Sequence, residues 1–177
     1  MTVSAHNAWA WGGTNDGVKP VSACLGMLIH AAGGDGNVLL NVGPRPDGMI
    51  DPAQANLLKA IGIWLTKYGE SIYGVRGGPW EPTASIASTR KAKTIYVHVL
   101  KWPDGAVKLP NIPAKILSAK ILGGGKAEMH QTESGVEISV APARRNTNDT
   151  VVVLKLGSDA LKIPALVVPT EGVQPKS

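Results

Sequence analysis

Apolar residues recur along the first 75 positions in two different patterns. Residues 38–42 form a short, mostly apolar run that has β-branched residues at both ends and glycine-rich turns on either side. This pattern is typical of a strand covered on both faces. Apolar residues spaced by three and four positions over 21–29 and 57–68 predict amphipathic helices before and after that strand. The first part of the chain therefore reads as loop, helix, strand, loop and helix.

Residues that start and stop helices mark where these two elements begin and end. Gly33 can close the first helix with a positive φ. The second helix has Asp51 as its N-cap, Pro52 at the first helical position and Gln54 in capping-box register, and Gly69 is predicted to end it.

After residue 74 the helical spacing gives way to short alternating runs separated by turn residues. The clearest runs are residues 94–100, 116–122, 136–140 and 151–156. Several short strands at such spacing predict an antiparallel β-sandwich. Two domains follow from this change of pattern, one over residues 1–77 and one over residues 78–177.

The first domain is too small to bury its own apolar faces. Leu28, Leu57 and Trp64 lie on those faces, and we expect them either to pack on the sandwich or to drive self-association. Limited proteolysis is then expected to cut near residues 74–82 and to leave a resistant carboxy-terminal core.

Composition places the chain among globular proteins, because its 177 residues are 44% hydrophobic and 18% charged. The net charge is +5, with residues 1–75 at −1 and residues 76–177 at +6. The lysines of the second half are scattered among apolar residues without an arginine cluster, which favours a solvated sheet face over a nucleic-acid interface. The single cysteine, Cys24, fits the apolar pattern of the first helix and is expected to be buried.

Neither a membrane segment nor a metal site is predicted. The sequence has no charged-then-apolar leader after Met1 and no apolar run long enough to span a bilayer. His98 and His130 lack a second ligand at metal spacing, so both are expected to be structural. No cofactor is expected.

Four motifs stand in order along the chain: WAW at residues 9–11, GGDGNVLLNVGPRPDGMI at 33–50, GIWL at 62–65 and YGESIYG at 68–74. Together they resemble the carboxy-terminal part of family 29 glycoside hydrolases, the α-L-fucosidases. The segment IYVHVLKWPDG at 95–105 is similar to the opening of the β-sandwich appended to that family's catalytic domain.

This resemblance implies a fold and a reaction. The fold is the last β/α units of a (β/α)8-like catalytic barrel followed by an antiparallel β-sandwich. The reaction is the retaining removal of terminal α-L-fucose from glycans or glycoconjugates, in the periplasm, the lysosome or outside the cell. The family's nucleophilic Asp, its acid/base Glu and its sugar-binding histidines lie upstream of the Trp9 region. The partners implied are therefore a fucosylated glycan and the remainder of the barrel, with neither nucleic acid nor membrane.

Structural roles are expected for four acidic side chains of the first half, Asp35, Asp47, Asp51 and Glu70. Asp35 lies in the turn before the predicted strand, Asp47 stands between Pro and Gly in a turn, and Asp51 is a helix cap. Glu70 follows the glycine that ends the second helix. No pair suited to general acid and base catalysis can be assembled from them, so the chain alone is expected to be inactive.

Trp9 and Trp11 are the candidate substrate-binding residues. They match the aromatic positions of the family's Ser-Trp-Gly-Tyr segment, although the small residues between them differ. An indole can cover the apolar face and the methyl group of a deoxy sugar. The alternative is that both indoles only pack against loop and helix. Asn41, at the end of the predicted strand, is expected to satisfy loop backbone groups rather than to contact substrate.

Three classes of function remain open at this point. The first is part of a fucosidase, the second is a non-catalytic carbohydrate-binding or scaffold module, and the third is a basic nucleic-acid-binding domain, which only charge favours. Burial of Trp80 and Trp102 would favour the first class. Exposure of flat aromatic rings on one sandwich face would favour the second.

Overall fold

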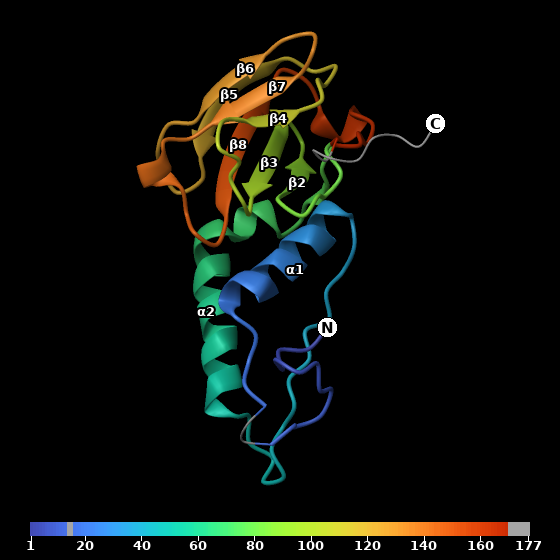
Figure 1. The fold of residues 1–177 in the computed structure, drawn as a ribbon. Helices are drawn as coiled ribbons and strands as arrows, with labels where there is room; N and C mark the ends of the chain where they lie inside the picture. The colour runs from blue at the N-terminus through green and yellow to red at the C-terminus, as the bar shows by residue number, and fades with distance from the viewer. Residues whose placement is uncertain (14–15, 170–177) are drawn as a thin grey trace, which may run out of the picture.

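The computed structural model describes residues 1–13 and 16–169, which form a β-sandwich, two α-helices and a region of loops (Figure 1). The helices lie between the sandwich and the loops, and α2 runs from the sheet toward the far end of the molecule. Within the described residues, no helix combines the length and the apolar character that crossing a membrane requires.

The sandwich consists of two sheets in which all strand pairs are antiparallel, as expected. The larger sheet has the order β1 (Arg76–Gly77), β2 (Ile86–Lys91), β3 (Thr94–Val99), β8 (Thr150–Leu156) and β5 (Ile116–Ile121). The smaller sheet has the order β4 (Val107–Leu109), β7 (Val136–Ser139) and β6 (Glu128–Gln131). Short 3-10 turns lie at η1 (Gly69–Ser71), η2 (Pro142–Arg144) and η3 (Ala160–Lys162). All four strands predicted from alternation are present.

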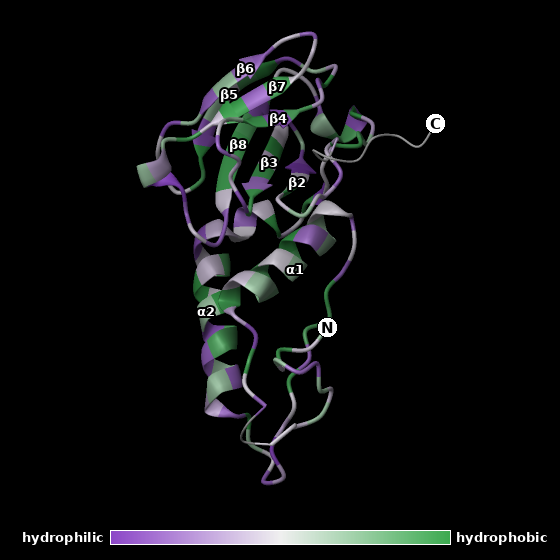
Figure 2. Cartoon of the chain, in the orientation of Figure 1, coloured by the Kyte–Doolittle hydropathy of each residue, from purple (hydrophilic) through white to green (hydrophobic). Residues whose placement is uncertain are grey.

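The central strands of the larger sheet are buried on both faces. On β3, Ile95 and Val97 point into the core between the sheets, whereas Tyr96 packs in a second cluster with the two helices. Leu57 and Trp64 of α2 are only 5% and 6% exposed in that second cluster, so part of the first half packs on the sandwich. Leu28 is half-buried. Figure 2 shows hydrophobic residues on β8 and on both helices.

Helix α1 (Val21–Gly33) ends differently from the prediction. Gly33 is the last helical residue and does not have a positive φ, while Asp35 does, at 60°. A Cβ on Gly33 would lie 3.0 Å from the Cβ of Ala87 on β2. The glycine is therefore explained by close packing of the helix end on the sheet, and the expected turn conformation is wrong. Cys24 is buried as predicted, and burial raises the pKa of its thiol.

Helix α2 (Pro52–Tyr68) begins at the predicted cap, because the backbone N–H of Ala53 donates to Asp51 Oδ1 over 2.9 Å. The capping-box role of Gln54 is wrong. Its side chain is 6% exposed, and its Oε1 accepts a hydrogen bond of 3.1 Å from the backbone N–H of Gly43. Gln54 lies on the buried face of the helix, where it binds a neighbouring loop.

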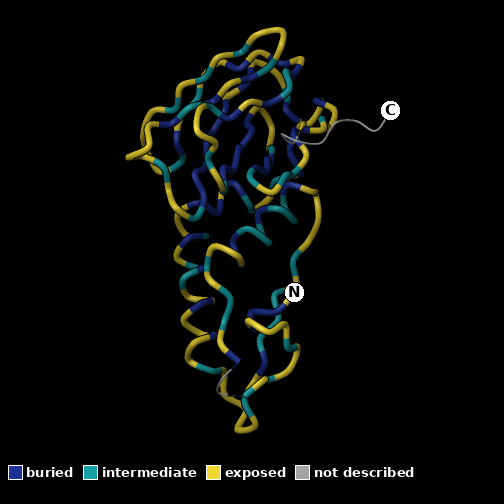
Figure 3. Tube along the Cα trace, in the orientation of Figure 1, coloured by how far each residue is buried: buried dark blue, intermediate teal, exposed yellow. Residues whose placement is uncertain are grey.

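The predicted buried strand over residues 38–42 does not form as a strand. The segment is extended, but it makes a single isolated bridge, between Thr2 and Asn41, and that bridge is parallel. Leu39 is 75% exposed, so the expected cover on both faces is also wrong for this chain. The described residues provide this segment with one short neighbour, which cannot bury both faces of a strand. Figure 3 shows the same contrast between the dark interior of the sandwich and the mostly exposed loops.

Candidate active-site loops

Two extended segments run side by side in the same direction in the region of loops that lies beyond α1 from the sandwich (Figure 1). The N–H of Val3 donates to the carbonyl of Asn41 over 3.0 Å, and the N–H of Asn41 donates to the carbonyl of Met1 over 2.8 Å. Because the segments are parallel, the loops that leave their carboxyl ends lie at the same end of the pair. These loops span residues 5–13 and 43–50.

Trp9 lies on the first loop with its indole 62% exposed, whereas Trp11 is half-buried. The loop is attached to the second segment, since Asn41 Nδ2 donates to the carbonyl of Trp9 over 2.8 Å. Asn41 therefore orders a loop, which is the role expected for it. The contact brings one predicted site residue next to the end of the second extended segment.

Gly43 allows the two loops to approach each other closely. A Cβ at this position would lie 2.6 Å from the carbonyl carbon of Ala10 and from the backbone nitrogen of Trp11, so no side chain fits. Gln54 holds the other side of Gly43 through its Oε1. A buried helix residue and a glycine together fix the backbone beneath the two tryptophans.

A polar network that sequence reasoning missed supports the first loop. Ser4 Oγ donates to Asp16 Oδ1 over 3.0 Å, and His6 Nδ1 lies 3.0 Å from the same oxygen. These two hydrogen bonds, that of Ser4 first, hold the pKa of the Asp16 carboxyl below its ordinary value. The ammonium of Lys19 donates to the carbonyls of Thr2 and Ser4. The only signal in the sequence was a histidine three residues before Trp9.

The other acidic side chains of the first half have structural contacts or positions. Asp35 accepts hydrogen bonds from the Arg76 guanidinium and, over 2.8 Å, from the backbone N–H of Gly77. Asp47 accepts from Arg45 and, over 3.0 Å, from the N–H of Met49. Asp51 caps α2, and Glu70 lies in η1. The structural roles expected for Asp35, Asp47 and Asp51 are confirmed.

The aromatic side chains of the sandwich are engaged in its packing. Trp80 is fully buried and donates from Nε1 to the carbonyl of Pro110 over 2.9 Å. Trp102 is half-buried, donates to Thr150 Oγ1 over 3.2 Å, and lies beneath the guanidinium of Arg145. This burial favours the fucosidase interpretation over a flat sugar-binding platform.

The two histidines of the sandwich lie in different environments. His98 is fully buried with Nδ1 2.7 Å from Asp149 Oδ2, and His130 is exposed on β6. In residues 1–13 and 16–169, no group of three or more His, Cys, Asp or Glu side chains is arranged to hold a metal ion.

Comparison with known proteins finds similarity to alpha-L-fucosidases. The family model described as alpha-L-fucosidase matches residues 1–70. Human tissue alpha-L-fucosidase is 33% identical over 122 residues, which are 64% of this chain and 26% of that protein. The chain thus spans about a quarter of the length of the curated relatives it matches.

Solved structures show the same fold over most of the chain. A Thermotoga maritima alpha-fucosidase in complex with a mechanism-based inhibitor aligns with a TM-score of 0.72 and 25% identity, covering 87% of this chain and 38% of that chain. A GH29 alpha-L-fucosidase from Bacteroides thetaiotaomicron aligns with a TM-score of 0.78 and 23% identity, covering 89% of this chain and 37% of that one. The resemblance to the carboxy-terminal part of these enzymes is confirmed.

Proposed function

We propose that this chain, which matches the carboxy-terminal part of the family 29 α-L-fucosidases, completes the active site of a retaining exo-α-L-fucosidase. The substrate is a glycan or glycoconjugate that ends in α-L-fucose. The observation that carries the proposal is the parallel pair of residues 1–4 and 39–42, whose carboxyl ends lead into loops that display Trp9. Catalytic β/α barrels place their sites on loops in this position.

The parallel pair is the remnant of a barrel in this proposal. Its two segments are joined through α1, which makes a strand–helix–strand unit of the kind that builds parallel sheets. Parallel sheets are covered on both faces, yet Leu39 is 75% exposed and Ile63 on α2 is 66% exposed. The remaining barrel strands and helices would cover these side chains. Without them, we expect the chain to self-associate through the same surface.

The chemistry requires groups from outside this chain. A retaining glycosidase needs two carboxyl groups about 5 Å apart, one as nucleophile and one as acid and base. Asp16, Asp35, Asp47 and Asp51 are each occupied by hydrogen bonds that hold loops or a helix start. The upstream barrel is therefore the source of both catalytic carboxylates in this proposal, and the chain alone is inactive.

Trp9 supplies an apolar surface to the bound sugar. Fucose is a deoxy sugar with a methyl group, and an exposed indole can pack against that methyl group and the adjoining ring face. The attachment of the Trp9 carbonyl to Asn41 holds the backbone of this loop against the second parallel segment. Trp11 is half-buried beside Gly43 and is assigned a supporting position at the same loop.

Hydrolysis of an aryl α-L-fucoside tests the proposal. The purified chain alone should show no turnover above a mock preparation, and the full-length protein that contains it should hydrolyse the substrate. Proton NMR of the first-formed fucose should show the α anomer, as retention requires. Turnover by the chain alone, or cleavage of a different sugar by the full-length protein, contradicts the proposal.

A further inference from the structure

His6 and Asp16 form a pair in which the acid is buried and the imidazole is presented to solvent. The side chain of Asp16 is 9% exposed and that of His6 is 74% exposed, with 3.0 Å between Oδ1 and Nδ1. An ionised carboxylate only accepts hydrogen bonds, so Nδ1 of His6 carries the proton that the pair shares. In the neutral ring Nε2 is then left as an acceptor.

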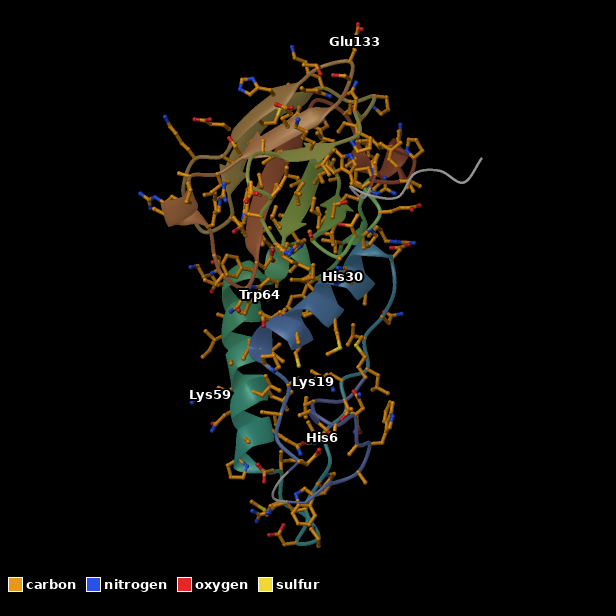
Figure 4. All side chains as sticks on the ribbon, in the orientation of Figure 1. His6, Lys19, His30, Lys59, Trp64 and Glu133 are labelled. Carbon is orange, nitrogen blue, oxygen red and sulfur yellow. The ribbon has the colours of Figure 1, made fainter. Side chains whose placement is uncertain are left out.

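The loop that carries His6 also carries Trp9, and its backbone is fixed from beneath. Ser4 Oγ accepts from the N–H groups of His6 and Ala8 at 3.2 and 2.9 Å, and Thr2 Oγ1 donates to the carbonyl of Ala8 over 2.8 Å. These bonds hold the backbone on either side of residue 7. Figure 4 shows His6 at the end of the molecule far from the sandwich.

The arrangement differs from both a nucleophilic triad and an ordinary surface ion pair. Ser4 is 2% exposed and its hydroxyl hydrogen goes to Asp16, so Ser4 has no access to a substrate. A polar contact with one largely exposed partner contributes little to stability. The buried carboxylate of Asp16, which Ser4 holds in place, does however fix the orientation and the tautomer of the exposed His6 ring.

We propose that His6 contacts the substrate by accepting a hydrogen bond at Nε2 from a sugar hydroxyl, and that Asp16 is the residue that positions it. This inference rests on the function proposed above. The hydroxyl belongs either to the fucose itself or to the sugar from which fucose is cleaved. Two substrates distinguish these sources, because an aryl fucoside has no hydroxyl on its leaving group and a fucosyl disaccharide does.

The test uses three substitutions at His6 in the full-length protein. Glutamine places an amide near the position of Nε2, whereas asparagine places one near Nδ1 and leaves nothing at Nε2. His6→Ala and His6→Asn should lower kcat/KM about 10-fold, as expected for one lost hydrogen bond, and His6→Gln should recover part of the loss. A loss with both substrates assigns the hydroxyl to fucose, and a loss with the disaccharide alone assigns it to the leaving sugar.

A second set of variants tests the role of Asp16. Asp16→Asn keeps an oxygen that can accept from Nδ1 and should retain more activity than Asp16→Ala. Adding Asp16→Asn, which keeps an oxygen that can accept from the Ser4 hydroxyl, to His6→Ala should lower kcat/KM by no more than His6→Ala does alone, because Asp16 affects the substrate only through His6 in this proposal. Independent, additive losses would overturn the positioning role.

The outcomes separate the two proposals. Full-length protein that cleaves no fucoside contradicts the proposed function, and this inference with it. Active protein whose kcat/KM is unchanged by His6→Ala and His6→Asn on both substrates overturns the role of His6 alone. Recovery by His6→Asn but not by His6→Gln also overturns it, since the bond to Asp16 would then be what matters. Thermal unfolding of His6→Ala should match that of the unchanged protein, because the side chain is exposed.

Discussion

The sandwich and the amino-terminal region differ in how their extended segments are partnered. In the sandwich, β3 lies between β2 and β8 and is covered on both faces, by the second sheet and by the helices. In the amino-terminal region, residues 39–42 have one parallel neighbour and leave Leu39 75% exposed. The core between the two sheets is closed within the sandwich, whereas the second parallel segment leaves a large apolar side chain exposed. The closed core and the candidate site therefore lie in different regions.

Substituting one tryptophan in each region should give the largest difference in stability between the two regions. Trp80→Ala removes a fully buried indole from the sandwich core and should cost about 3–5 kcal/mol of unfolding free energy. Trp9→Ala removes an indole that is 62% exposed and should change stability by less than about 0.5 kcal/mol. Urea unfolding of the two variants measures both values. Equal losses would show that the two regions share one core.

The same Trp9→Ala substitution should have its effect on catalysis in the full-length protein. Loss of the apolar contact with the sugar should lower kcat/KM about 10- to 100-fold, or roughly 1–3 kcal/mol. Steady-state kinetics on an aryl α-L-fucoside measures this. An unchanged kcat/KM together with normal stability would return Trp9 to a packing role.

Gly43 provides a way to test the close approach of the two loops. Gly43→Ala should destabilise the chain by about 1–3 kcal/mol, because its Cβ would meet the Ala10 and Trp11 backbone at 2.6 Å. Gly62→Ala on α2 is the matched control, since its Cβ meets nothing within 4 Å and alanine should add about 0.5–1 kcal/mol of helix stability. A neutral Gly43→Ala result in thermal unfolding would mean that the loops move apart without cost.

A smaller effect is expected from the ion pair that connects the end of α1 to β1. The Arg76 guanidinium, followed by the Gly77 N–H, holds the pKa of Asp35 well below its usual range. A lowered folded-state pKa gives stability that is present above about pH 4 and is lost as the pH falls through the folded value. Since both side chains are substantially exposed, Asp35→Asn should cost only about 0.5 kcal/mol at pH 7 and reduce the acid loss. If unfolding curves from pH 7 to pH 2 show no difference between Asp35→Asn and the unchanged protein, the Asp35–Arg76 contact does not contribute to stability.

Local patterns predicted both helices and the strands β3, β5, β7 and β8. The alternation over residues 94–100 and the cap at Asp51 each depend on nearby residues, and both appear in the structure. The pairing of Asp16 with His6 and the bond from Gly43 to Gln54 depend on how separate loops meet. The spacing of residues along the chain does not show which loops contact each other. For the same reason, the sequence could not decide whether the apolar faces of the helices pack on the sheet or drive self-association.

Burial on both faces was predicted for the wrong strand. Residues 38–42 have the apolar composition of a covered strand, but their cover would come from elements that the described chain does not supply. Strand β3 carries polar residues on alternate positions and is nevertheless fully buried, because α2 and its Trp64 lie over that face.

The division of the chain into two domains at residues 77 and 78 stays a prediction. Residues 77–80 are buried, which makes the exposed loop over residues 44–50 the more accessible target for a protease.

Hydrogen exchange of the chain alone and of the full-length protein, compared residue by residue, tests the central claim most directly. The amides of β3 and β8 should be protected in both proteins, because their ladder is complete within the sandwich. The amides of Val3 and Asn41 are hydrogen-bonded in their parallel pair but lack the further strands that flank β3, so they should exchange faster than the β3 amides in the chain alone and more slowly in the full-length protein. Protection of Val3 and Asn41 in a monomeric sample of the chain alone, equal to that of β3, would contradict the account.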